Sequence, residues 1–219
     1  MHVSAARLVR VHQVHGAEVA IAEEVHGRRP AADIIVSRDH TLALAVQAAD
    51  CIPLLLADPG TGAVAGAHAG WRGLAAGVPA AAVASLTREF GSRSADLVAA
   101  IGPAIGACCY EVGGDVRDRF EAAGASSGQL ARWFLTVPIR SAANPSMSCV
   151  SGPRRADRWF FDGWTAAREQ LAEAGVPDAQ IFLAGLCTAS HPDILCSYRR
   201  DGSPAGRIAG AIRSWRLHP

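Results

Sequence analysis

The stretch that decides the fold is Ala63-Val-Ala-Gly-Ala67, followed directly by His68-Ala-Gly-Trp-Arg-Gly73. Its first part is small and apolar, which indicates a strand buried on both faces. The second part places a histidine, an indole and a guanidinium where that strand turns. Strand ends in α/β proteins often carry functional side chains, because the sheet fixes them while the loop leaves them reachable. We therefore predict an α/β fold with a site at this turn.

Composition indicates a globular chain with a sizeable core, since 50% of its 219 residues are hydrophobic. The net charge of +1 argues against binding nucleic acid or a membrane surface through bulk electrostatics. All 21 basic residues are arginine, which excludes a catalytic lysine. There is no apolar run of about 18 residues and no hydrophobic region of a signal peptide. A cytoplasmic protein is expected, with neither a membrane nor nucleic acid as its partner.

Hydrophobic patterning predicts alternating strands and helices along most of the chain. Extended segments are expected at 7–14, 18–22, 42–46, 52–56, 97–101 and 181–184. Helices are expected over 74–90, 114–123 and 159–174. The Ser-, Ala-, Pro- and Arg-rich segment 124–158 predicts a long loop, and 194–198 with 207–212 predicts a hairpin around Asp201-Gly202.

Three separate segments carry the candidate chemistry, namely His15, Cys51 and His68, each beside small or turn-forming neighbours. Their spacing is too wide for a zinc finger. Two imidazoles and a thiolate from separate strands or loops are typical of a catalytic Zn²⁺ site with one position left open. The alternative is that Cys51 is a small core residue and both histidines are satisfied locally. The segments of Cys51 and His68 are expected to pair, which would bring these two side chains together.

The strings around these residues resemble one family. They are Gln13-Val-His-Gly16, Ala49-Asp-Cys51, His68-Ala-Gly-Trp-Arg-Gly73 and Ile101-Gly-Pro-Ala-Ile-Gly-Ala-Cys-Cys-Tyr-Glu-Val112. Later strings follow in the same order: Phe161-Asp162, Cys187-Thr188, Ser197-Tyr-Arg-Arg-Asp-Gly202 and Gly206-Arg207. Together they resemble the YfiH family from about residue 8 to the end of the chain.

The resemblance implies a zinc-dependent purine nucleoside phosphorylase that also acts as an adenosine deaminase, in a family long labelled as polyphenol oxidoreductases or laccases. It implies His15, Cys51 and His68 as the zinc ligands. The implied reactants are phosphate and adenosine, inosine, guanosine or methylthioadenosine, which give the free base and ribose 1-phosphate. Members carry several dozen residues before the Gln-Val-His-Gly string, so this chain is expected either to be shortened at its N-terminus or to have had its start codon placed late.

The fold that the resemblance implies has mixed β-sheets packed as a sandwich with helices outside, in α/β/β/α layers. A single domain over 1–219 is expected. A bacterial toxin deamidase has a related fold.

Phosphorolysis requires groups that bind an anion, and arginine can do so with two parallel hydrogen bonds. The candidates are Arg72, Arg199 and Arg200, which lie beside turns rather than in a charge run. The alternative for the Arg199-Arg200 pair is a solvated or ion-paired surface. Trp71 is expected either to stack on a purine or to cover the strand end. Thr188 follows a predicted strand, which suits a residue that lines the site.

Other classes of function remain alternatives. Two histidines and a cysteine are also a blue-copper ligand set, although a multicopper oxidase uses His-x-His pairs and this chain has none. A cysteine hydrolase or deamidase would use Cys51 as its nucleophile and His68 as its base, with no need of His15. A non-catalytic binding domain would tolerate His15→Ala.

The six cysteines predict free thiols or metal ligands, since a chain of this size without a secretory signal needs no disulfide framework. Adjacent cysteines rarely reach disulfide geometry without strain, so the thiols of Cys108 and Cys109 are expected to face opposite sides. Cys108 and Cys187 are candidates to border the pocket, with simple burial as the alternative for Cys187. Cys149 and Cys196 are expected to be incidental.

Overall fold

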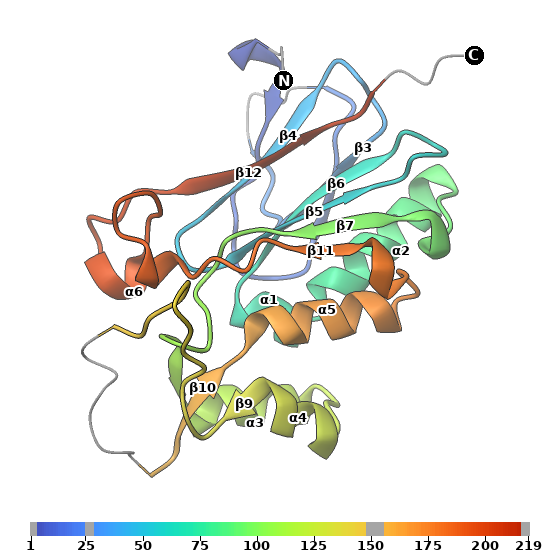
Figure 1. The fold of residues 1–219 in the computed structure, drawn as a ribbon. Coiled ribbons are helices and arrows are strands. Elements are labelled where there is room, and N and C mark those ends of the chain that lie inside the picture. Colours follow the sequence, from blue (N-terminus) through green and yellow to red (C-terminus); the bar gives the residue numbers. More distant parts are fainter. Residues whose placement is uncertain (1–3, 25–28, 148–155, 216–219) are drawn as a thin grey trace.

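The centre of the computed structural model, which describes residues 4–24, 29–147 and 156–215, is a six-stranded mixed sheet (Figure 1). The strand order is β11-β7-β5-β6-β3-β2. The strands are β2 (Val19–Ile21), β3 (Ile34–Ser37), β5 (Ile52–Ala57), β6 (Val64–Ala69), β7 (Val98–Ile101) and β11 (Ile181–Leu183). Every residue of β6 is buried, and β6 pairs antiparallel with β3 and β5. The strand expected before the His68 turn is therefore confirmed, and it lies inside the sheet.

A second, three-stranded sheet packs on one face of the first. It consists of β1 (Leu8–Val9), β4 (Ala43–Ala48) and β12 (Ile208–Arg213), in the order β1-β4-β12. Leu44 and Val46 of β4 meet Ile35 and Val64 in a core between the sheets. At Gly210 the sheets approach so closely that a Cβ would lie 2.6 Å from the Cβ of Pro53. This close packing confirms the sandwich of sheets.

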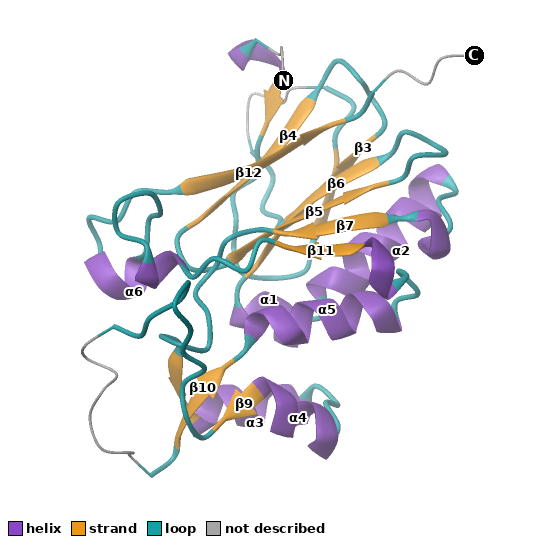
Figure 2. Cartoon of the chain, viewed as in Figure 1, coloured by secondary structure: helices purple, strands orange, loops and turns teal. Residues whose placement is uncertain are grey.

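Helices α1 (Trp71–Ala75), α2 (Val78–Phe90) and α5 (Gly163–Glu173) lie on the other side of the large sheet, which gives a helical layer outside the sandwich (Figure 2). The predicted helix over 74–90 is confirmed, with a break where Gly77 adopts a φ of 77°. Pro79 lies in the first turn of α2, where no intrahelical N–H bond is lost, and Gly91 ends the helix at a φ of 70°. The mixed α/β class is confirmed.

A smaller unit corrects the long loop expected over 124–158. Ser126 and Gln129 form a capping box that starts a helix, and Trp133 and Phe134 bury their rings. These buried rings give the segment a small hydrophobic core, which its largely polar composition does not predict. The unit contains β8 (Glu111–Gly113), α3 (Gly114–Ala122), α4 (Ser127–Trp133), β9 (Phe134–Leu135) and β10 (Arg158–Phe161). Residues 136–147 do form a loop without helix or strand.

A helix expected over 159–174 is confirmed over 163–173, but its expected start and an expected hairpin are wrong. The helix expected over 159–174 begins only after Asp162, whose carboxylate caps α5 by accepting the N–H of Thr165, and the residues before it form β10. The hairpin expected from 194–198 and 207–212 is replaced by α6 (Tyr198–Asp201) and by β12, which pairs with β4 along its whole length. A long-range partner thus overrides the local turn signal.

The described residues also contain short 3₁₀ helices at Ala5–Arg7, Ser94–Asp96, Asp178–Gln180 and Thr188–Ser190. None of the helices in the described ranges is long and apolar enough to cross a bilayer.

Candidate metal centre and its cavity

A cavity of about 620 Å³ opens where β6 ends and α1 begins. This volume lies in the range of small-molecule sites. Four arginines and three aromatic residues are among its lining: Arg29, Arg72, Arg199, Arg207, Trp71, Tyr110 and Tyr198. The turn after β6 is therefore part of a cavity, as the sequence indicates.

His15, Cys51 and His68 come together in this cavity. One ligand atom from each lies within 4.8 Å of the other two, and the imidazole rings meet edge to face with centroids 4.8 Å apart. His68 is buried, Cys51 is half-buried and His15 is exposed. The expected approach of Cys51 and His68 is confirmed, since Cys51 directly precedes β5, and β5 pairs with β6.

Asp33, which sequence reasoning missed, fixes both histidines. Its carboxylate accepts a 2.8 Å hydrogen bond from Nδ1 of His68, which leaves Nε2 of that ring available for a ligand. The same carboxylate accepts the backbone N–H groups of Val14, His15 and Gly16 at 3.1, 3.0 and 2.7 Å. These bonds hold His15 at a φ of 62°, a strained value for a side chain other than glycine. A lone carboxylate directly before the apolar run of β3 was the available signal.

The ionisable groups of the cluster stabilise one another's charged forms. Burial opposes ionisation of Asp33, but hydrogen bonds from His68 and from backbone N–H groups lower its pKa. Burial likewise disfavours the Cys51 thiolate, yet hydrogen bonds from His15 and His68 lower the pKa of the thiol to about 7. Burial would also lower the pKa of His68, but Asp33 and Cys51 raise it to about 9. The protein therefore favours a thiolate at Cys51 beside a positively polarised imidazole.

Gly70 makes room for the cluster. A Cβ at this position would lie 2.7 Å from the Cys51 sulfur and 3.4 Å from Cδ2 of His15. Any side chain would displace the thiol or the ring, because the distance from its Cβ to the Cys51 sulfur would be well below the van der Waals contact distance. The glycine before Trp71 is thus explained by the site rather than by the turn.

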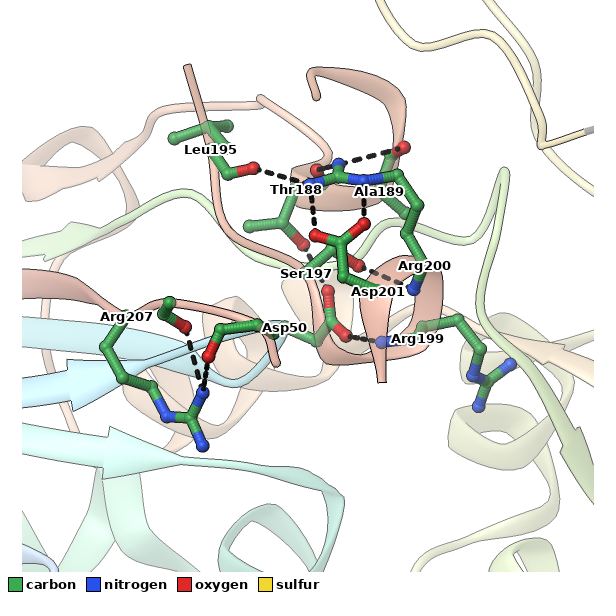
Figure 3. Close-up of polar contacts among 11 residues, drawn as sticks. Asp50, Thr188, Ala189, Leu195, Ser197, Arg199, Arg200, Asp201 and Arg207 are labelled. Atoms are coloured by element: carbon green, nitrogen blue, oxygen red, sulfur yellow. Dashed lines mark hydrogen bonds and ion pairs between the residues drawn. The ribbon is translucent and has the colours of Figure 1, made fainter. Parts of the chain in front are cut away.

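Asp50, next to Cys51, links its own loop to the segments of Thr188 and Arg199 by hydrogen bonds. It adopts a φ of 85°, and its two carboxylate oxygens accept the hydroxyl of Thr188 and the backbone N–H of Arg199, each at 2.6 Å (Figure 3). Thr188 is fully buried and does not line the cavity. The contact instead anchors the α6 segment beside Cys51.

The two neighbouring arginines differ in their placement. Arg200 turns its guanidinium to the carbonyl oxygens of Thr188 and Leu195 and to Asp201, and it does not line the cavity (Figure 3). Arg199 lines the cavity, with its guanidinium 5.1 Å from the ring centre of Tyr110. Arg207, which sequence reasoning missed, lines the cavity from the loop before β12.

Arg72 and Trp71 lie together at the start of α1. The Arg72 guanidinium covers the indole at 4.3 Å from its centre, and both residues line the cavity. One face of Trp71 is therefore occupied by a cation, a contact worth up to about 1 kcal/mol where it is exposed to solvent.

The donor set fits Zn²⁺. Two imidazole nitrogens and a thiolate are ligands that zinc accepts at about 2.0–2.3 Å, and three protein ligands leave a fourth position for another molecule. The exposed side at His15 gives access to that position from the cavity. The same donors are also compatible with copper.

The chain is similar to known proteins over most of its length. Residues 1–214 match the family described as multi-copper polyphenol oxidoreductase laccase. A Streptomyces coelicolor protein named purine nucleoside phosphorylase is 38% identical over 213 residues, which cover 96% of this chain and 76% of that protein. A Bacteroides thetaiotaomicron protein of the same name is 33% identical over 190 residues, 87% of this chain and 62% of its own length.

A solved structure shows the same fold. The crystal structure of the hypothetical protein YfiH from Bacillus licheniformis superposes with a TM-score of 0.84 at 29% identity, covering 98% of this chain and 76% of that one. Sequence and structure thus place this chain in the multi-copper polyphenol oxidoreductase laccase family, the YfiH family.

Proposed function

We propose that this chain is a zinc-dependent enzyme that cleaves purine nucleosides with phosphate. The observation that carries the proposal is the convergence of His15, Cys51 and His68 in a cavity that also presents arginines. The names of its relatives supply the reaction class.

The proposed phosphate-binding groups are Arg72, Arg199 and Arg207, which line the cavity together with Arg29. Phosphate binding favours guanidinium groups, which can donate two parallel hydrogen bonds. Arg200 supports this site indirectly, since its guanidinium ties the turn after β11 to α6. The sequence hypothesis of phosphate binding is therefore retained for Arg72 and Arg199 and withdrawn for Arg200.

The purine base has aromatic surfaces available to it. Tyr198 lines the cavity and is 57% exposed, which leaves its ring free to stack. Trp71 offers the face that Arg72 does not cover. Stacking would hold the base while the arginines hold phosphate against the ribose.

In the proposed reaction a phosphate oxygen forms a bond to C1′ of the ribose while the bond from C1′ to the purine nitrogen breaks. The electron pair of that bond leaves with the base, which takes up a proton, and the products are the free base and ribose 1-phosphate. The arginines would neutralise phosphate at the reacting carbon, where negative charge must be stabilised. Bound Zn²⁺ would supply Lewis-acid polarisation of a substrate atom.

Adenosine deamination is the proposed side activity, because an open zinc position suits the activation of water. Water would add at the purine carbon that carries the amino group, and ammonia would leave. Asp50 is not the proton carrier in this proposal, since both of its oxygens accept hydrogen bonds from the protein.

The deciding experiment combines metal analysis of protein purified without added metal with chromatography of adenosine reactions, with and without phosphate. About one zinc per chain and phosphate-dependent release of adenine would support the proposal, and inosine would reveal deamination. Copper together with phenol oxidation would instead support the laccase activity that the family description names. Base release that does not require phosphate would contradict phosphorolysis.

A cysteine hydrolase is the second candidate, because Asp33, His68 and Cys51 form the chain of hydrogen-bonded groups that activates a thiolate. His15 separates the two candidates. Under the zinc proposal, His15→Ala abolishes activity and added Zn²⁺ protects Cys51 of the unaltered protein from iodoacetamide. A hydrolase would keep activity in His15→Ala and lose it on alkylation.

A further inference from the structure

A second cluster of thiols lies outside the cavity. One sulfur from each of Cys108, Cys109 and Cys187 lies within 4.8 Å of the other two, and all three residues are at most 2% exposed. The cysteines come from the turns that follow β7 and β11, which run parallel and side by side. The expectation that Cys108 and Cys109 face opposite sides is therefore wrong, because the 106–109 turn directs both toward Cys187.

Backbone N–H groups point at two of the three sulfurs. The backbone N–H of Gly106 donates to the Cys187 sulfur at 3.3 Å, and the N–H of Met147 donates to the Cys109 sulfur at 3.4 Å. Such donors stabilise negative charge on sulfur.

Most of the other neighbours are apolar, apart from the Ser190 hydroxyl, 3.6 Å from the Cys108 and Cys109 sulfurs, and the Pro145 carbonyl, 3.6 Å from the Cys109 sulfur. Ile105 and Ala189 complete the buried group, and Met147 and Trp164 pack against it. Thiolates in such a place are costly unless a cation compensates their charge. Simple packing of small residues would explain burial, but it would not explain N–H groups directed at two of the three sulfurs.

We propose that Cys108, Cys109 and Cys187 form a second, closed metal site for one thiophilic ion, with Cu(I) favoured over Zn²⁺. An ion bonded to three sulfurs at about 2.3 Å holds them about 4.0 Å apart, which agrees with the observed grouping. No fourth histidine, cysteine or carboxylate of the described residues joins the group. Structural zinc sites use four such ligands, whereas three soft sulfurs suit Cu(I). Binding releases the remaining thiol protons and involves no oxidation.

A metal ion bound at the three cysteines would stabilise residues that support or line the cavity. Cys187 is followed by Thr188, whose hydroxyl bonds to Asp50, and Cys109 is followed by Tyr110, which lines the cavity. An ion bound to both turns would fix these neighbours without contacting a substrate. The expected signature is a melting temperature that rises with Cu(I) concentration, because the ion binds only the folded chain.

The test uses the full chain carrying Cys51→Ala, which disables the first cluster and makes the result independent of the proposed function. Under anaerobic conditions with reductant, Cu(I) is supplied from its bicinchoninate complex, with Zn²⁺ in a parallel experiment. We expect one Cu(I) per chain in this variant, none after adding Cys187→Ser, and one after the matched control Cys196→Ser. Circular dichroism and melting curves check that each variant is folded.

The unaltered protein supplies a readout that does not depend on a substitution. Cu(I) should protect the peptides that carry Cys108, Cys109 and Cys187 from pulsed N-ethylmaleimide, and it should leave Cys196 as reactive as before. Equal Cu(I) binding with and without Cys187→Ser, or a disulfide within the cluster of the reduced protein, would overturn the proposal. One Zn²⁺ per chain without Cu(I) binding would overturn the assignment to copper.

Discussion

The two sulfur-containing clusters differ in almost every physical respect. The first, His15 with Cys51 and His68, mixes nitrogen and sulfur donors and opens into a cavity. The second, the three cysteines at 108, 109 and 187, is all sulfur and is buried among mostly apolar side chains, with the Ser190 hydroxyl beside two of its sulfurs. An open cluster leaves a position for substrate, whereas a closed one holds an ion in place. The two proposals accordingly assign a reaction to the open cluster and a structural role to the closed one.

Backbone strain separates the clusters as well. Among the described residues, the non-glycine positions with positive φ are His15, Asp50 and Asp157. The first belongs to the open cluster and the second precedes its cysteine, whereas the closed cluster contains none. Strain concentrated at one site is typical of function, because the surrounding structure must supply the energy that holds it.

The largest effect should come from Cys51→Ala, which removes a ligand of the open cluster. We expect loss of zinc and a fall in kcat/KM for phosphorolysis of at least about 1,000-fold, since a metal contributes several kcal/mol to such a transition state. Metal analysis and base release would measure both. Cys196→Ala serves as the control, and an active, zinc-free Cys51→Ala would show that the open cluster is not the reacting site.

Asp33→Asn should have the next largest effect, because the amide has a single acceptor oxygen for His68 and for three backbone N–H groups. We expect zinc affinity or activity to fall about 10- to 100-fold, as when other groups that orient a metal ligand are lost. Competition with a chromogenic chelator would measure the affinity. Asp58→Asn is the matched control, because Asp58 is also buried but bonds only within its own turn and to Ser92. Equal losses of zinc affinity and activity in both variants would show that Asp33 stabilises the fold in general and does not orient the metal ligands.

Arg72→Gln tests whether the open cluster binds an anion. We expect the KM for phosphate to rise about 10-fold, equivalent to about 1.4 kcal/mol, with a smaller change in the KM for nucleoside. Initial rates at varied phosphate would show the split. Arg88→Gln, on the exposed side of α2 and paired with Glu89, should leave both constants unchanged. An unchanged phosphate KM in Arg72→Gln would remove that residue from the proposed anion site.

Arg200→Gln should have the smallest effect on catalysis. Its guanidinium binds protein carbonyls and Asp201, so we expect a melting temperature lower by a few degrees and a phosphate KM within about twofold of the original. Differential scanning fluorimetry and initial rates would measure the two. A large rise in the phosphate KM alone would return Arg200 to the anion site.

The sequence predicted the open cluster better than the closed one, and the reason is local. His15, Cys51 and His68 each lie beside turn-forming residues at strand ends, a pattern visible in single segments. Asp33 escaped notice because its partners are Val14, Gly16 and His68, which are distant in the chain. The closed cluster was misjudged because local reasoning on two adjacent cysteines did not include the third, on a neighbouring strand's turn.

The sequence by itself determined the mixed α/β class, the buried strand before His68, the helix that ends at Gly91 and the resemblance to a family. These depend on hydrophobic period and turn chemistry, which act over a few residues. Only the tertiary structure decided that β12 pairs with β4, that Arg200 turns away from the cavity and that one carboxylate orients two histidines. Those features arise from contacts between distant segments, whose energies no local pattern contains.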